Sequence, residues 1–141
     1  MSSSPLTAQV RDFNWLLTRF ANDTPGVEYA LCVSADGLVM AFSSRLDRAT
    51  AERLAAIVSG LRSLADGTAW LVNQHAAHQV IVELHTSFFF VTAIGDGSAL
   101  GVIADRESAD MGQIGYEIAL LVEQARTRLT PALRAELKQT V

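Results

Sequence analysis

The sequence predicts an α+β domain in which antiparallel strands are covered by helices on both faces. Segments with apolar residues three and four positions apart alternate with short apolar runs bounded by turn residues. Their order along the chain is helix, two strands, helix, three strands, helix. Strand-like runs such as Phe88-Phe89-Phe90-Val91 are apolar at every position. Because a sheet with one wet face would alternate, both faces of this sheet are expected to be covered.

The first helix is expected over residues 5–21. Ser4 can serve as its N-cap, and Pro5 suits the first helical position. Turn residues at 22–26 end it. Its apolar face consists of Leu6, Val10, Phe13, Leu17 and Phe20.

Two apolar runs, 27–34 and 38–43, flank Asp36-Gly37 and predict a β-hairpin, because glycine supplies the positive φ of a tight turn. Asp47 can then cap a second helix that closes at Asp66-Gly67. Residues 68–77 fit either a short strand or a last helical turn. The inner stripe of the second helix is expected to be Leu54, Ile57, Val58, Leu61 and Leu64, and its wet face includes Arg48, Arg53 and Arg62.

Three strand-like runs follow, at 78–84, 87–94 and 99–104, and their short turns predict an antiparallel meander. A third helix is expected to start near Arg106 and to break at Thr130-Pro131. Residues 132–141 form a frayed or short extra helix in this interpretation. The chain is thus read as one domain over 1–141, with its core at about 5–128 and a C-terminal tail at 129–141.

Composition excludes several classes of protein. Half of the 141 residues are apolar, which excludes a largely disordered chain. The net charge of −4 and the pI near 5.2 argue against a nucleic-acid-binding surface, which usually requires a basic face. The single cysteine fits a reducing cytoplasm, and no signal peptide or membrane-spanning run is recognised. We therefore expect a cytoplasmic protein that reaches a membrane only through a partner.

No residue constellation indicates catalysis, a metal or a cofactor. His75 and His78 have metal-like spacing but lack a third ligand, and Cys32 sits in an apolar run typical of a buried side chain. The glycines of 95–98 join two strands rather than opening a helix, so a hairpin turn is expected there instead of a phosphate loop. Glu83 is expected to point outward or to pair with an arginine. The sequence therefore predicts neither an enzyme nor a cofactor.

A set of motifs in order carries a family resemblance. They are Asn14-Trp15-Leu16-Leu17, Pro25-Gly26-Val27, residues 34–38, Leu54-Ala55-Ala56-Ile57, residues 89–95, residues 100–104 and residues 110–117. Over about 5–128, the chain resembles the Roadblock family of the dynein light-chain superfamily. It is similar to the single-domain Roadblock proteins of actinobacterial conservon operons, which also encode a sensor-kinase-like membrane protein and a Ras-like GTPase.

The resemblance implies a five-stranded antiparallel sheet, with the second helix on one face and the first and third on the other. It also implies a homodimer that pairs the strand at 78–84 and sets the second helices side by side. The implied function is a non-catalytic adaptor or regulator of a Ras-like small GTPase, with the sensor-kinase-like protein as a further partner. The residues expected at the partner or dimer interface are Leu54, Ile57, Val58, Val80 and Val82, with Arg48, Arg53 and Arg62 as exposed candidates that fit a solvated helix face equally well.

A second function class competes with this one. A small-ligand sensory domain of the kind associated with sensor kinases can have the same order of helices and strands. It would need an inner pocket with polar groups, whereas the strands are rich in Phe, Val, Ile and Ala. Ligand-dependent thermal shifts would favour a sensory domain. Concentration-dependent dimerisation and GTPase binding would favour the regulator.

Overall fold

The computed structural model describes residues 5–140, with side chains described for 8–139. The predicted Ser4 cap and the Leu6 side chain lie outside this description. The expected order of elements is confirmed, with one further helix at the end. In chain order the elements are α1 (Pro5–Asp23), β1 (Val27–Val33), β2 (Val39–Phe42), α2 (Arg48–Leu71), β3 (Gln79–Glu83), β4 (Ser87–Ala93), β5 (Ala99–Asp105), α3 (Met111–Arg128) and α4 (Pro131–Thr140).

The strands form one five-stranded antiparallel sheet, as the resemblance implied, and the structure gives their order as β2-β1-β5-β4-β3. The β1–β2 hairpin turns at Gly37, whose φ of 84° is the positive value expected from the Asp36-Gly37 pair. The meander β3–β4–β5 is also confirmed. The β1–β2 hairpin and the β3–β4–β5 meander join where β1 pairs with β5, with Cys32 opposite Leu100.

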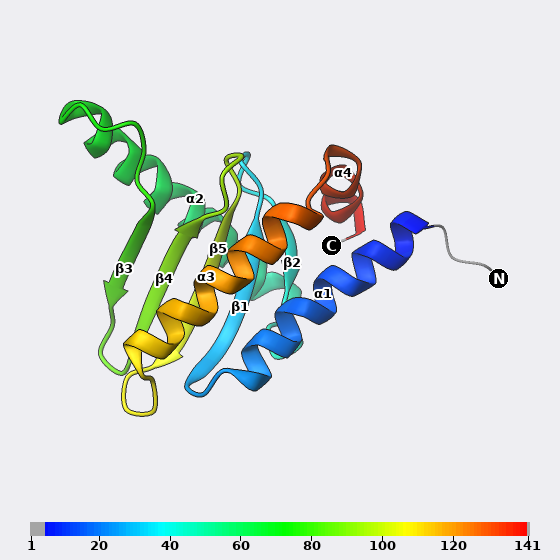
Figure 1. Ribbon diagram of the computed structural model, residues 1–141, viewed down its shortest axis with the longest axis horizontal. Coiled ribbons are helices and arrows are strands. Elements are labelled where there is room, and N and C mark those ends of the chain that lie inside the picture. Colours follow the sequence, from blue (N-terminus) through cyan, green and yellow to red (C-terminus); the bar gives the residue numbers. More distant parts are fainter. Residues whose placement is uncertain (1–4, 141) are drawn as a thin grey trace.

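Helices cover both faces of the sheet. Figure 1 shows α1 and α3 lying across one face, while α2 crosses behind the strands. The apolar core is accordingly split into two clusters, one under α1, α3 and α4 and one under α2. Phe90 belongs to the first cluster, whereas Phe89 and Val91 belong to the second. The uninterrupted apolar run of β4 is explained by this alternation between two dry layers.

The third helix begins later than the sequence indicated. Its N-cap is Asp110, whose carboxylate accepts a hydrogen bond from the Gln113 backbone N–H at 3.1 Å. The residues from Arg106 to Asp110 form a connecting loop instead. This loop packs against Gly26, where φ is 89° and an added Cβ would lie 2.8 Å from the Cα of Ala109. Only glycine fits that contact and that backbone conformation without strain.

The C-terminal segment is part of the core rather than a tail. α4 lies beside α1 and β2, and its leucines Leu133 and Leu137 are 2% and 0% exposed. Arg134 forms an ion pair with Asp96 in the β4–β5 turn. Lys138 lies 3.6 Å from the carboxylate of Asp36 in the β1–β2 turn. The core boundary expected near residue 128 is therefore wrong, because the apolar face of α4 completes the cluster under α1.

Candidate interaction surface

β3 forms one edge of the sheet and is paired with a neighbour, β4, on one side only. Val80 and Val82 are half-buried in the α2-side cluster, while Ile81 lies on the opposite face with 48% of its surface exposed. Glu83 lies at the end of the strand and forms an ion pair with Arg106 at 2.9 Å, so that of its two expected roles the pairing with an arginine is confirmed. An edge strand with apolar side chains on both faces is a template for pairing with another chain.

α2 carries two parallel apolar rows. The inner row of Ala51, Ala55 and Val58 is buried against the sheet, and Ala69 near the end of the helix is also buried. Beside it runs a second apolar row with successive spacings of three, four, three and seven residues, whose members are half-buried or exposed. This spacing is the one that packs helix against helix in coiled coils. We call this second set the outer row: Leu54, Ile57, Leu61, Leu64 and Leu71.

The outer row shows that the predicted inner stripe mixed two faces of the helix. Val58 is completely buried and cannot contact a partner, so its placement at an interface is wrong. Ile57 and Leu64 are not buried in the chain's own core, since they are 50% and 75% exposed. Leu54 is half-buried, as are Val80 and Val82 on β3. These residues form a half-open apolar layer at one side of the molecule.

The end of α2 extends beyond the sheet. The helix continues past the expected stop at Asp66-Gly67 as far as Leu71, which settles residues 68–71 as helical. Figure 1 shows these last turns extending past the β3 edge. Trp70 is 77% exposed, Leu71 74% and Val72 58%. We call these three residues the α2 overhang; a lone chain leaves their apolar surface in water, which is unusual outside an interaction site.

The three candidate arginines of α2 differ in their surroundings. Arg48 is exposed and lies 3.7 Å from Glu52, and Arg53 is exposed. Arg62, expected at the surface, is only 18% exposed in its side chain. Its guanidinium donates to the backbone carbonyls of the β4–β5 turn and lies 3.6 Å from Asp66. Arg62 therefore ties α2 to its own sheet, and its expected exposure is wrong.

The remaining candidates for chemistry occupy structural positions. Cys32 is completely buried, and this burial raises the pKa of its thiol far above the usual value. The glycines at 95 and 97 adopt positive φ in the β4–β5 hairpin turn, as expected. Within residues 5–140 no group of three His, Cys, Asp or Glu side chains is arranged to hold a metal ion. In the same range no helix is long and apolar enough to cross a membrane.

A cleft beside α2 bears on the sensory alternative. It measures about 220 Å³ and lies between α2 and the two adjoining hairpin turns, lined by Ser34, Ser59, Arg62 and Asp66 among others. Small-molecule sites usually measure about 300–1,000 Å³. The guanidinium in this cleft is already bound to backbone carbonyls and a carboxylate. The cleft therefore lends the sensory interpretation little support.

One known family accounts for most of the sequence. The Roadblock/LC7 domain family matches residues 13–104, about two thirds of the chain. The chain belongs to this family. No curated protein sequence matches it significantly.

Several solved structures have a similar arrangement of helices and sheet. A Roadblock/LC7 domain from Streptomyces avermitilis is 36% identical with a TM-score of 0.76, covering 81% of this chain and 94% of its own. MglB from Myxococcus xanthus is 17% identical with a TM-score of 0.75, covering 82% of this chain and 93% of its own. The gliding protein MglB from Thermus thermophilus is 16% identical with a TM-score of 0.69, covering 100% of this chain and 96% of its own. At these lower identities the likeness to MglB shows the fold alone.

Sequence reasoning missed part of the apolar surface. Ile81 is expected in a strand but not among the interface residues, and the α2 overhang lies within residues 68–77, which fit either a short strand or a last helical turn. A signal for the overhang was present, because Leu71 continues the outer row from Leu64 at seven-residue spacing. Nothing local in the sequence indicated that the sheet would end beneath the middle of α2.

Proposed function

We propose that this chain is a non-catalytic regulator that forms a homodimer through β3 and α2 and binds a Ras-like small GTPase. The observation that carries the proposal is the open β3 edge next to the outer row, in a chain that belongs to the Roadblock family. The family resemblance supplies the GTPase as partner and the absence of an active site. A tetrameric arrangement has been solved for an MglB, a protein of the same fold.

The outer row favours a second helix as its occupant. In an antiparallel pair of α2 helices, Leu61 would lie across from Leu64 of the second copy, and Leu54 across from Leu71. Gly60 and Gly67 flank this row, and a Cβ added at either would meet no atom of the chain within 4 Å. Each glycine costs about 1 kcal/mol relative to alanine inside a helix. Packing within a single chain does not require them, whereas close approach of another helix would.

Self-association can be tested with two matched substitutions. Ile57→Asp places a charge in the outer row, and Leu120→Asp places one on α3 at a position of similar exposure, 45% against 50%. Sedimentation across a range of concentrations should show a dimer for the wild type and for Leu120→Asp, and a monomer for Ile57→Asp. Equal behaviour of the two variants would contradict an interface on α2.

GTPase binding requires a separate experiment. The tagged protein is added to lysate of its host with excess GDP or a non-hydrolysable GTP analogue, and the bound proteins are identified. Preferential recovery of a Ras-like GTPase with the analogue would support an effector or a hydrolysis regulator, and equal recovery would indicate a scaffold. If no GTPase is recovered in either state, the proposed function fails. Arg53→Ala and Arg48→Ala then test whether these exposed arginines contact the GTPase.

The cellular setting follows from the same resemblance. A sensor-kinase-like membrane protein encoded with conservon Roadblock proteins is the further partner that we propose, and it would bring a cytoplasmic regulator to the membrane. Co-purification of that protein from the detergent-solubilised membrane fraction tests this part of the proposal. If that protein is not co-purified, the proposal that this chain binds a Ras-like GTPase still stands.

A further inference from the structure

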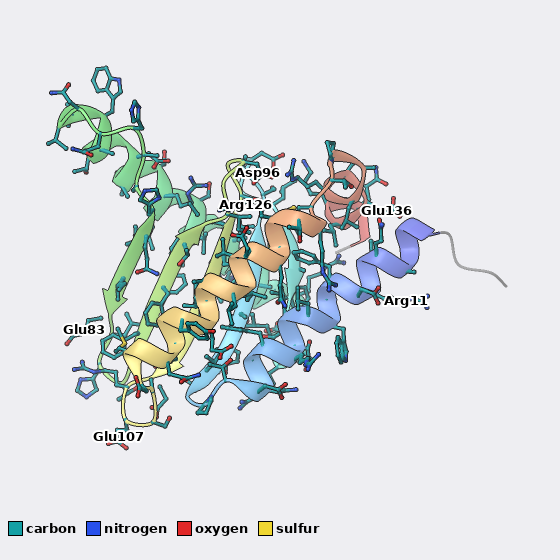
Figure 2. All side chains as sticks on the ribbon, viewed as in Figure 1. Arg11, Glu83, Asp96, Glu107, Arg126 and Glu136 are labelled. Carbon is teal, nitrogen blue, oxygen red and sulfur yellow. The ribbon has the colours of Figure 1, made fainter. Side chains whose placement is uncertain are left out.

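The β4–β5 turn is held from the side of α4 by an ion pair. The Arg134 guanidinium binds one carboxylate oxygen of Asp96, and the other oxygen accepts hydrogen bonds from the hydroxyl and the backbone N–H of Ser98. Figure 2 shows Asp96 at the end of the sheet near which α4 lies. The second ion pair of α4 joins Lys138 to Asp36 in the β1–β2 turn instead. α4 therefore contacts the β4–β5 turn through the charge of Arg134.

The same turn is held from the other face of the sheet by α2. The Arg62 guanidinium donates to the backbone carbonyls of Gly97 and Ser98, the latter at 3.3 Å. Hydrogen bonds from a charged donor are stronger than those between neutral groups, so this contact fixes the turn against α2. Because Asp96, Gly97 and Ser98 are consecutive, a change in how Arg134 holds the carboxylate is passed directly to the carbonyls that Arg62 binds.

Arg62 also connects the turn to the segment that leads into β3. Its guanidinium lies 3.6 Å from one carboxylate oxygen of Asp66, one turn further along α2. The other oxygen of that carboxylate accepts a hydrogen bond from the Ala77 backbone N–H at 2.9 Å. Ala77 is two residues before β3, and residues 73–76 before it are exposed. The Asp66 carboxylate therefore fastens the α2–β3 connection to α2 just before the strand of the proposed interface.

These contacts form a continuous relay from α4 to the α2–β3 connection. The members of the relay are Arg134, Asp96, Ser98, Arg62, Asp66 and Ala77. We infer that docking of α4 on the β4–β5 turn regulates self-association of the chain through this relay. The inference rests on the dimer of the proposed function and deepens it. Arg134 and Arg62 are positioning residues, because they set the place of the chain entering β3 without contacting the second copy.

The surroundings of Arg134 support a role beyond holding α4 in place. Its Nε is buried and has no hydrogen-bond partner among the described residues, and such burial costs free energy. Leu133 and Leu137 already anchor the helix in the core under α1. An aliphatic side chain at position 134 would avoid the cost at Nε. Stability of α4 therefore does not by itself require a guanidinium here, whereas a relay to Asp96 does.

Two matched substitutions on α4 test the relay in the dimer Kd. Arg134→Met removes the charge beside Asp96, and Lys138→Met removes the charge beside Asp36; the two native side chains are 31% and 32% exposed. We expect the Kd from sedimentation to rise about two- to thirtyfold for Arg134→Met, the range typical of residues that couple two sites, and to stay within about twofold of wild type for Lys138→Met. Arg134→Lys keeps a positive charge at this position and should restore most of the affinity.

A double variant tests whether the two arginines act in series. Arg62→Met interrupts the relay at α2 and should raise the Kd by a factor similar to that of Arg134→Met. Because either substitution breaks the same chain of contacts, the double variant should dimerise no more weakly than the weaker single variant. Multiplication of the two factors in the double variant would show independent effects and would overturn the inference.

Amide hydrogen exchange at Ala77, followed by NMR, measures the relay without a dimer. The variants are made in the Ile57→Asp background, in which the proposed dimer is disrupted, so that a second copy does not protect the amide. Arg134→Met and Arg62→Met should speed exchange at Ala77 severalfold, because the bond to the Asp66 carboxylate opens more often. Lys138→Met should leave this rate unchanged.

The Ser108 amide is the internal control for exchange. Its N–H is also held by a carboxylate, that of Asp105 at 3.0 Å, but at the opposite end of β5 from the relay. Faster exchange at Ser108 as well as at Ala77 would indicate general loosening of the fold and would overturn the inference. Circular dichroism verifies that each variant is folded.

Failure of the inference is distinguishable from failure of the proposed function. In a chain that dimerises, equal changes in Kd for Arg134→Met and Lys138→Met would overturn the inference, as would a change in Kd without faster exchange at Ala77. A wild type that does not self-associate at any concentration would instead refute the proposed dimer and, with it, its regulation. Exchange at Ala77 would still decide whether the relay exists. None of these results depends on recovery of a GTPase.

Discussion

Replacing Leu137 by alanine tests whether α4 belongs to the cooperative core. The Leu137 side chain is completely buried in the cluster under α1. A ten-residue helix has little stability of its own in water, so α4 depends on such contacts. Leu120→Ala on α3 is the control, because Leu120 is also a helical leucine but is 45% exposed.

The expected magnitudes separate the two variants. Removing a fully buried leucine side chain costs about 2–5 kcal/mol, because a cavity adds to the lost transfer free energy. Leu137→Ala should therefore lower the free energy of unfolding by about 3 kcal/mol. Leu120→Ala should cost about 1 kcal/mol or less, since much of that side chain is already in water. A domain of this size has roughly 5–15 kcal/mol of stability, so both variants should remain folded.

Urea unfolding followed by circular dichroism measures the difference. With m near 1–3 kcal/mol/M, about 3 kcal/mol lowers the midpoint by roughly 1–3 M for Leu137→Ala. Both variants are measured at one protein concentration, because self-association adds to apparent stability. An unchanged midpoint for Leu137→Ala, or an equal shift for both variants, would refute the assignment of α4 to the core.

Three further predictions follow from local features. Burial alone would raise the pKa of Asp96, but hydrogen bonds from Ser98 and the charge of Arg134 outweigh it and hold the pKa below its usual value. A carboxylate whose pKa is lower in the folded than in the unfolded chain stabilises the fold above the unfolded pKa near 3.9, and this stabilisation is lost as the pH falls through the folded pKa. When unfolding is measured at decreasing pH, Asp96→Asn should therefore lose less stability below about pH 4 than the wild type. Cys32 should resist iodoacetamide at pH 8 in the native protein and react fully in urea, as mass spectrometry would show. Gly26→Ala should destabilise by more than about 1 kcal/mol in thermal unfolding, because of its positive φ and the nearby Ala109 backbone.

Local patterns were sufficient for most of the fold. The Asp36-Gly37 pair requires a tight turn with positive φ, and the two-sided apolar run at Phe88–Phe90 requires a strand covered on both faces. Both expectations are confirmed. The pairing of β1 with β5 joins distant segments, so it was not predicted from the residues. The family resemblance supplied the single five-stranded sheet.

The candidate surface was predicted less well, because charge and hydrophobicity give only an average tendency to be exposed. Arg62 lies four residues after Val58 and therefore on the same helix face. Its long side chain reaches carbonyls of the β4–β5 turn, which a charge pattern does not reveal. Ile57 and Leu64 were expected in the core because they are apolar, but the sheet fully buries only the neighbouring row of Ala51, Ala55 and Val58. Exposure of these residues depends on where the sheet ends, which is a tertiary property.

The α2 overhang has a consequence for the dynamics of the free chain. The helix ends of a protein fray where few contacts hold them, and Trp70 to Val72 have little of their own chain to pack against. The last turns of α2 should therefore exchange amide hydrogens rapidly in a dilute monomer and slowly in the proposed dimer. The local stability of this helix end would then depend on the protein concentration. A partner that docks near this end would meet an ordered surface only after two chains have associated.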